Sequence, residues 1–136
     1  MVRTSPVLID SLDHLVLTVR DIDATIVFYR DWLGMEVVTF GGGRKALAFG
    51  QQKINLHEAD KEFVPPVIKA ERPVPGSGDL CFLTSASLAD VVARAEELGI
   101  AIIEGPDRRT GAVGAINSVY ARDPDGNLIE VSNRLY

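Results

Sequence analysis

The sequence predicts an α+β fold made of two βαβββ modules whose sheets form one curled mixed sheet around a cavity. The chain twice shows a short β-rich run, then one amphipathic helical segment, then further strand segments. A stretch rich in proline and glycine separates the two copies. Because each copy has a single helix, only one face of each sheet can be covered, and the uncovered faces are free to curl together.

The first module spans about residues 10–58. Residues 11–19 read as a strand, and Asp21 caps a helix whose apolar residues recur at helical spacing until Gly34 ends it. Three strands follow, at 35–40, 45–49 and 53–57, with a glycine turn at 41–43.

Residues 59–78 form a connector, because four prolines and a Gly-Ser-Gly run can sustain neither a helix nor a central strand. The second module spans 79–136 and begins with a strand at 79–84. Ser87 caps a helix from Leu88 to Leu98, which Gly99 closes. The remaining strands are predicted at 101–104, 115–121 and 127–132, with a glycine-rich loop at 104–114.

Composition limits the possible partners. A chain of 136 residues is long enough for one domain, 1–136, and its net charge of -5 lacks the basic footprint of a nucleic-acid binder. The single cysteine, Cys81, excludes an internal disulfide and a multi-cysteine metal site. No apolar segment is long enough to be a signal peptide or to span a membrane. We therefore expect a cytoplasmic protein with a small-molecule partner and no membrane partner.

Glu130 is the residue that most needs an explanation. The run Asp123-Pro124-Asp125-Gly126 is a strong turn signal, and a short strand follows it. Alternation along that strand puts Ile129 and Val131 on one face and Glu130 on the other. A carboxylate on the uncovered face is expected to line the cavity.

Superimposing the two modules by their strands predicts a metal site. His14 then matches Asp79, and His57 matches Glu130. These are the only two histidines of the chain, and all four side chains share the uncovered face. A single strand histidine is more often structural, but this arrangement favours a site for Zn²⁺, Ni²⁺, Fe²⁺, Mn²⁺ or Co²⁺ over Ca²⁺. The apolar residues predicted on the opposite, covered face are Leu15, Leu17, Ile54, Leu56, Leu80, Phe82, Ile129 and Val131.

Arg109 is a second kind of candidate. It lies in the predicted glycine-rich loop, where its guanidinium and the backbone amides are suited to a substrate carboxylate or phosphate. A solvated basic turn is the alternative interpretation.

Two stretches carry a family resemblance: residues 13–21 with Phe28-Tyr29 and Leu33-Gly34-Met35, and the closing residues 120–130. With them the chain resembles the vicinal oxygen chelate superfamily of glyoxalase I, extradiol dioxygenases and bleomycin- and fosfomycin-resistance proteins. Within it, residues 55–58, 73–77, 79–82 and 109–111 look most like glyoxalase domain-containing protein 5 and its bacterial relatives.

The resemblance implies the glyoxalase/bleomycin resistance/dioxygenase fold, with metal ligands at His14, His57, Asp79 and Glu130. It also implies a base that removes a proton next to a carbonyl, with Glu130 as first candidate and Asp79 as second. The ligand types are permuted relative to glyoxalase I, which usually has a carboxylate on the fourth strand and histidine on the fifth.

The expected function is a metal-dependent lyase or isomerase of the glyoxalase class, working as a homodimer on a small oxygenated substrate. An extradiol-type dioxygenase with Fe²⁺ and a non-catalytic drug- or metabolite-binding resistance protein are the alternatives.

Overall fold

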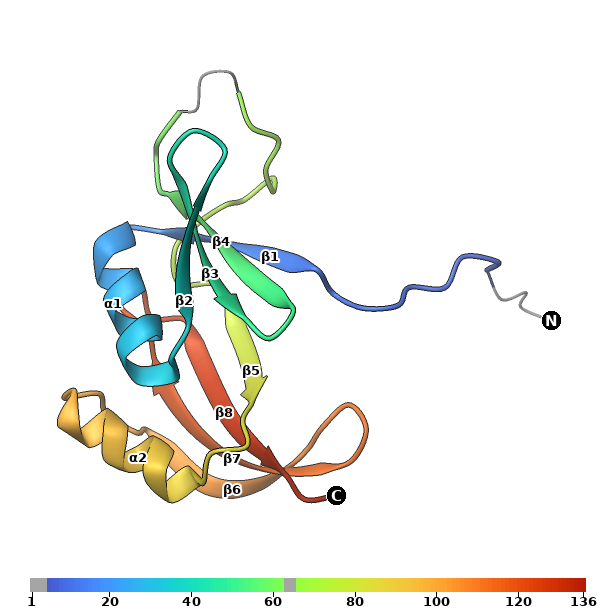
Figure 1. Cartoon of the computed structure of the whole chain (residues 1–136), viewed down its shortest axis with the longest axis vertical. Coiled ribbons are helices and arrows are strands. Elements are labelled where there is room, and N and C mark those ends of the chain that lie inside the picture. Colours follow the sequence, from blue (N-terminus) through green and yellow to red (C-terminus); the bar gives the residue numbers. More distant parts are fainter. Residues whose placement is uncertain (1–4, 63–65) are drawn as a thin grey trace.

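The computed structural model describes residues 5–62 and 66–136, and it contains two four-stranded sheets with both helices on one side of the molecule (Figure 1). The first module comprises β1 (His14–Val19), α1 (Ile22–Leu33), β2 (Glu36–Phe40), β3 (Arg44–Phe49) and β4 (Gln52–Glu58). The second comprises β5 (Asp79–Leu83), α2 (Leu88–Glu97), β6 (Glu104–Thr110), β7 (Ala115–Arg122) and β8 (Leu128–Arg134). The predicted βαβββ order of each module is confirmed.

Both sheets have the same topology. Their strand orders are β1-β4-β3-β2 and β5-β8-β7-β6. In each sheet the first strand runs parallel to the last, and the other neighbours are antiparallel. Antiparallel neighbours need only a short turn, whereas the parallel pair requires the longer path through the helix. The repeat seen in the sequence is therefore also a repeat of sheet topology.

Side chains and a glycine set the helix ends as predicted. The Asp21 carboxylate accepts a hydrogen bond from the Ala24 amide at 3.0 Å, and Ser87 Oγ accepts one from the Asp90 amide at 3.1 Å. Gly34 ends α1 in the left-handed conformation, at a φ of 67°. These caps satisfy amide and carbonyl groups that would otherwise be orphaned at the helix ends.

The two modules share one hydrophobic core. Trp32 Nε1 on α1 donates a hydrogen bond to the Val91 carbonyl on α2 at 3.0 Å, and the rings of Phe49 and Phe82 meet edge to face at 5.3 Å. All eight strand residues predicted on the covered face lie in this core or pack against it. The alternate strand residues, which include the predicted site, therefore project from the faces that carry no helix.

The prediction of a strand at 101–104 is wrong. The strand is β6, and it occupies most of the predicted loop at 104–114, with an irregular register between Glu104 and Asp107. Gly105 and Pro106 suggested a loop, but β6 is the edge strand of its sheet, where glycine, proline and bulges are tolerated.

Gly105→Ala is expected to destabilise the fold by about 2 kcal/mol or more. Gly105 has a φ of 97°, and a Cβ built on it would lie 2.3 Å from the Ser118 carbonyl oxygen, which is fixed in β7. Thermal or urea unfolding of the variant measures the loss. Gly126→Ala is a matched control, since Gly126 has a similar φ of 88° but no atom within 4 Å of the added Cβ. Equal losses in both variants would contradict the close approach at Gly105.

Two segments leave the sheets. The N-terminal arm, residues 5–13, extends away from the rest of the molecule, and the described connector residues, 59–62 and 66–78, contain no helix or strand, as predicted (Figure 1). Residues 1–4 of the predicted domain and 63–65 of the predicted connector lie outside the described residues. Among the helices that the structure describes, none is long and apolar enough to span a membrane.

Candidate functional site

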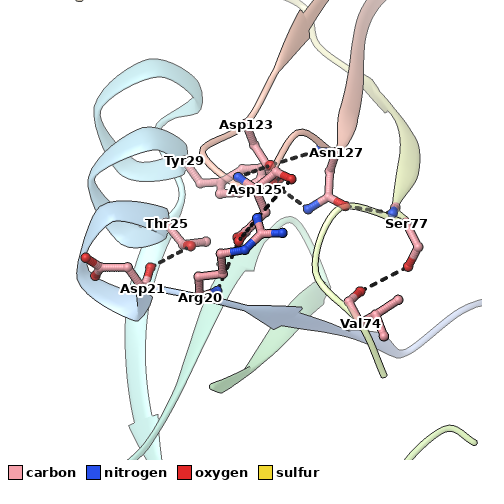
Figure 2. A network of polar contacts seen from close by, with 10 residues as sticks. Arg20, Asp21, Thr25, Tyr29, Val74, Ser77, Asp123, Asp125 and Asn127 are labelled. Carbon is pink, nitrogen blue, oxygen red and sulfur yellow. Dashed lines mark hydrogen bonds and ion pairs between the residues drawn. The ribbon is translucent and has the colours of Figure 1, made fainter. Parts of the chain in front are cut away.

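The turn at 123–127 positions the strand that carries Glu130. Asp123 Oδ1 accepts hydrogen bonds from the amides of Asp125 and Asn127, at 2.9 and 3.0 Å. Asp123 Oδ2 accepts from Asn127 Nδ2 at 2.8 Å and from the Tyr29 hydroxyl at 2.6 Å (Figure 2). Burial and the charge of Asp123 raise the pKa of the Tyr29 phenol far above its usual value, so the phenol stays protonated and donates.

The same turn is tied to both modules. Asp125 Oδ1 accepts hydrogen bonds from the Arg20 amide and guanidinium at 3.0 and 3.3 Å, at the end of β1. Asn127 Oδ1 accepts from the Gly78 amide at 2.6 Å, just before β5 begins. This network therefore joins the end of β1 to the residues just before β5 and β8, the strands that carry Asp79 and Glu130.

Glu130 lies half-buried in the middle of β8, on the face that carries no helix. Ser118 on β7 donates a hydrogen bond to Glu130 Oε2 at 2.6 Å and shares another with Ser132 Oγ at 2.7 Å. Cys81 Sγ lies 3.4 Å from Ser132 Oγ, and burial raises the pKa of its thiol. Within the part of the chain that the structure describes, hydroxyl groups hold this carboxylate and no cation pairs with it.

Tyr120 borders the same carboxylate. Arg109 Nε donates a hydrogen bond to the Tyr120 hydroxyl at 2.9 Å, and Arg109 also pairs with Asp107 and Glu104 at 3.3 and 3.5 Å. Burial raises the pKa of Tyr120, the bond from Arg109 opposes this, and the charge of Glu130 raises it further. The guanidinium of Arg109 thus holds Tyr120 beside Glu130, and the substrate-binding role suggested for Arg109 stays a prediction.

His14 and His57 occupy different settings on the first sheet. The side chain of His14, at the start of β1, is 44% exposed, and its Nδ1 lies 2.8 Å from Asp13 Oδ2. His57, near the end of β4, is only 4% exposed, and its Nε2 accepts a hydrogen bond from Arg44 Nη2 at 3.0 Å. A guanidinium has no acceptor, so the imidazole lone pair accepts and His57 is neutral. Burial, then Arg44 and Lys69, lower the pKa of His57.

The strand register corrects the predicted match of His57 with Glu130. In the second module Asp79 lies opposite Leu128, and Glu130 is two residues further along. In the first module His14 lies opposite Lys53, so the residue two further along is Asn55, while His57 lies opposite Thr18. If His14 matches Asp79, the counterpart of Glu130 is therefore Asn55. His14 and His57 are also separated by four residues of strand, about 13 Å.

A single chain does not bring the four predicted ligands together. Among residues 5–62 and 66–136, no group of three or more His, Cys, Asp or Glu side chains is close enough to hold a metal ion. Asp79 is exposed at the start of β5, and Glu130 lies on the second sheet while His14 lies on the first. Their chemistry suits a divalent transition metal, and within one chain they are divided between the two sheets.

Sequence reasoning missed three polar residues of the uncovered faces: Asn55, Ser118 and Tyr120. The signal was available, since alternation along β7 puts Ser118 and Tyr120 on the face of Glu130.

Comparison with known proteins identifies the family. Residues 11–131 match the family model described as the Glyoxalase/Bleomycin resistance protein/Dioxygenase superfamily. The chain belongs to this superfamily. The predicted vicinal oxygen chelate resemblance and the predicted fold are therefore confirmed, while the likeness to glyoxalase domain-containing protein 5 stays a prediction.

Two relatives from this superfamily are 60% identical to the chain. Virulence protein STM3117 of Salmonella typhimurium matches over 125 residues, which are 92% of this chain and 85% of the relative. Glyoxalase domain-containing protein RDO1 of Mycosarcoma maydis matches over 123 residues, 90% of this chain and 68% of the relative. The crystal structure of STM3117 superimposes with a TM-score of 0.88, covering 95% of this chain and 100% of that one.

More distant solved structures share the architecture. Lactoylglutathione lyase from Agrobacterium tumefaciens is 26% identical, with a TM-score of 0.72 over 93% of this chain and 95% of that one. The fosfomycin resistance protein FosX of Listeria monocytogenes, crystallised with Mn(II) and sulfate, is 20% identical with a TM-score of 0.65 over 94% of each chain. At that identity the likeness to FosX shows the fold alone.

Proposed function

We propose that this protein is a divalent-metal-dependent enzyme of the glyoxalase class, a lyase or isomerase that acts on a small oxygenated substrate. The main support for the proposal is the placement of Glu130. Its half-buried carboxylate lies on a sheet face without a helix, accepts a hydrogen bond from Ser118 and is bordered by Tyr120. A purely structural strand would place an apolar or exposed polar residue there. The likeness to a lactoylglutathione lyase supports the same class.

The proposed site is formed by two copies of the chain. In one chain His14 and Glu130 lie on separate sheets, and the described residues hold no metal cluster. The N-terminal arm leads directly into His14 and exposes Val7, Leu8, Ile9 and Leu12, more apolar surface than a lone arm usually leaves in water. A homodimer in which this arm packs on a second copy would cover these side chains and bring His14 of one subunit toward Glu130 of its partner subunit.

His14, Asp79 and Glu130 are the proposed ligands. One imidazole and two carboxylates suit Zn²⁺, Ni²⁺, Fe²⁺, Mn²⁺ or Co²⁺, and such a metal supplies Lewis-acid polarisation of two adjacent substrate oxygens. The ligand role predicted for His57 stays a prediction. The Nε2 lone pair of His57 already accepts a hydrogen bond from Arg44. The positive charges of Arg44 and Lys69 also disfavour a metal cation at this imidazole.

The chain's own groups would handle the proton. In an isomerisation, a carboxylate removes a proton from the carbon next to a carbonyl and returns it to the neighbouring carbon, so no outside reductant or oxidant is needed. Glu130 is the first candidate for this base and Asp79 the second. The Ser118 hydroxyl donates a hydrogen bond to Glu130 Oε2, and Tyr120 lies opposite Glu130 on the neighbouring strand β7.

The extradiol dioxygenase alternative has less support. That chemistry uses two histidines and one carboxylate on Fe²⁺, and here the second histidine is paired with Arg44. The binding-only alternative is less well supported, because a metal-free resistance protein does not require the half-buried Glu130 carboxylate and its hydroxyl partners.

The test is metal reconstitution. Chelator-treated protein without a His tag is reloaded separately with each of the five metals and assayed with the glutathione adduct of methylglyoxal. We expect isomerisation that depends on added metal, in air, without oxygen uptake. Oxygen uptake with a catechol in the Fe²⁺ sample would establish the dioxygenase instead, and metal-free protein that takes up none of the five metals would overturn both enzymatic functions.

Ser118→Ala is expected to weaken metal binding by about tenfold, because groups that hydrogen-bond a metal ligand typically contribute that much to affinity. Equilibrium dialysis with Mn²⁺ or Zn²⁺ measures the change. Ser85→Ala is the control, since Ser85 is exposed in the turn before α2. Unchanged affinity in Ser118→Ala would argue that Glu130 does not bind the metal through the oxygen that Ser118 holds.

A further inference from the structure

A cavity of about 290 Å³ lies between β1, the end of β4 and the connector. Apolar side chains form much of its wall, including Val16, Ile68 and Val74. Its volume accommodates about ten water-sized groups, enough for a small organic molecule. None of the sequence predictions used this cavity, although His57 lies on its wall.

The charged groups of the cavity are all cationic. Lys69 and Arg72 line it, and no Asp or Glu is among its described lining residues, in a chain whose net charge is -5. Neither Lys69 nor Arg72 forms an ion pair within the part of the chain that the structure describes. Cations without an ion-pair partner in a concave site raise the local concentration of anions and favour their binding. Lys69 also lines an adjoining pocket that contains Glu58, Asp60 and Glu62, whereas Arg72 does not.

The His57 side of the cavity adds to the positive potential. Arg44 Nη2 donates to His57 Nε2 at 3.0 Å, so a neutral imidazole separates this guanidinium from the cavity. Burial first, and then the charges of Arg44 and Lys69, lower the pKa of the His57 imidazole. Two cations, Arg44 and Lys69, therefore act on this uncharged ring at the wall of the cavity.

We propose that this cavity is a subsite for the oxyanion group of a small organic acid, a carboxylate or a phosphonate, bound by the Lys69 ammonium and the Arg72 guanidinium. Charge-assisted hydrogen bonds from these two groups match the geometry of such oxygens. The carbon part of the molecule lies against Val16, Ile68 and Val74.

The subsite also defines a substrate class. Val16 is two residues from His14 on the same face of β1, a distance of about 7 Å along the strand. A molecule that fills the cavity and reaches His14 carries its acid group several bonds from the oxygens at the proposed metal. The inference rests on the proposed function only in taking this acid as the substrate.

The experiment uses the full chain freed of metal by a chelator and follows the ring signals of its two histidines by NMR. Sodium acetate or methylphosphonate is titrated in at constant ionic strength, with chloride as the counter-titration, and His14→Gln assigns the signals. We expect saturable shifts of the His57 signals with the organic anions and not with chloride. Absence of these shifts, or the same shifts with chloride, would overturn the subsite.

Charge-neutral variants locate the binding. Lys69→Gln and Arg72→Gln are each expected to weaken anion binding about tenfold or more, because each removes one charge-assisted contact. Both residues are exposed, so neither variant threatens the fold. Arg30→Gln on α1 is the matched control, since Arg30 is exposed and paired with Asp31. Equal affinity in all three variants would overturn the assignment.

The two proposals fail separately. Anion binding that depends on Lys69 in a protein that takes up no metal would keep the subsite and overturn the proposed enzyme. Metal uptake without any response of His57 to either anion would overturn the subsite alone. Tighter binding of acetate than of methylphosphonate, or the reverse, tells which acid the subsite takes.

Discussion

Asp123→Ala is expected to lower the free energy of unfolding by about 3–5 kcal/mol. The Asp123 carboxylate is buried and accepts four hydrogen bonds: from the Tyr29 hydroxyl, from two backbone amides of its own turn, and from Asn127 Nδ2. Alanine leaves all four donors without their acceptor in a site that water does not reach. Few single substitutions elsewhere in this chain would orphan so many groups.

Urea unfolding of Asp123→Ala and wild type measures the effect. Tyr29→Phe removes only one donor and leaves the carboxylate with three, so it is expected to cost about 1–2 kcal/mol. Asp10→Ala, in the exposed N-terminal arm, is the control that changes charge alone. A loss below that of Tyr29→Phe in Asp123→Ala would contradict a network centred on this carboxylate.

Glu130→Gln is expected to weaken metal binding by at least about a hundredfold and to abolish any metal-dependent turnover. The substitution keeps the shape of the side chain and an oxygen that can accept from Ser118, so the fold is expected to persist. What it removes is the negative charge and the strong donor oxygen that a divalent metal requires.

Elemental analysis after equilibrium dialysis, with circular dichroism to verify folding, measures the change. Glu58→Gln is the matched control, because Glu58 follows His57 in β4, is exposed, and points to the other face of the sheet. Full metal occupancy in Glu130→Gln would remove Glu130 from the site, whatever the fate of the other ligands.

Local signals in the sequence were sufficient to predict most of the fold. Asp21, Gly34 and Ser87 marked helix ends where the structure has them, and alternation placed the covered face correctly in both sheets. The strand β6 was misplaced because Gly105 and Pro106 signal a loop locally, while pairing with β7 overrides that signal at a sheet edge.

The candidate site was harder to derive, for a physical reason. Which residues of two parallel strands lie opposite each other depends on the register, and matching the modules by strand ends placed His57 where the pairing places Asn55. Alternation could identify the face of Glu130 but not the hydrogen bonds from Ser118 or the position of Tyr120. Whether two sheets complete one site across a second copy is a property of the assembly and leaves no periodic trace in a single chain.

The proposed site across two subunits is tested most directly by mixing two inactive variants. His14→Ala and Glu130→Gln are each expected to bind no metal at the site as pure proteins. Unfolded together and refolded as a mixture, half of the dimers pair one variant with the other, and each such dimer has one of its two sites intact. For a shared site we expect recovery of about a quarter of the wild-type metal stoichiometry in the mixture. No recovery, in a mixture shown to contain the mixed dimers, would contradict a site shared between two subunits.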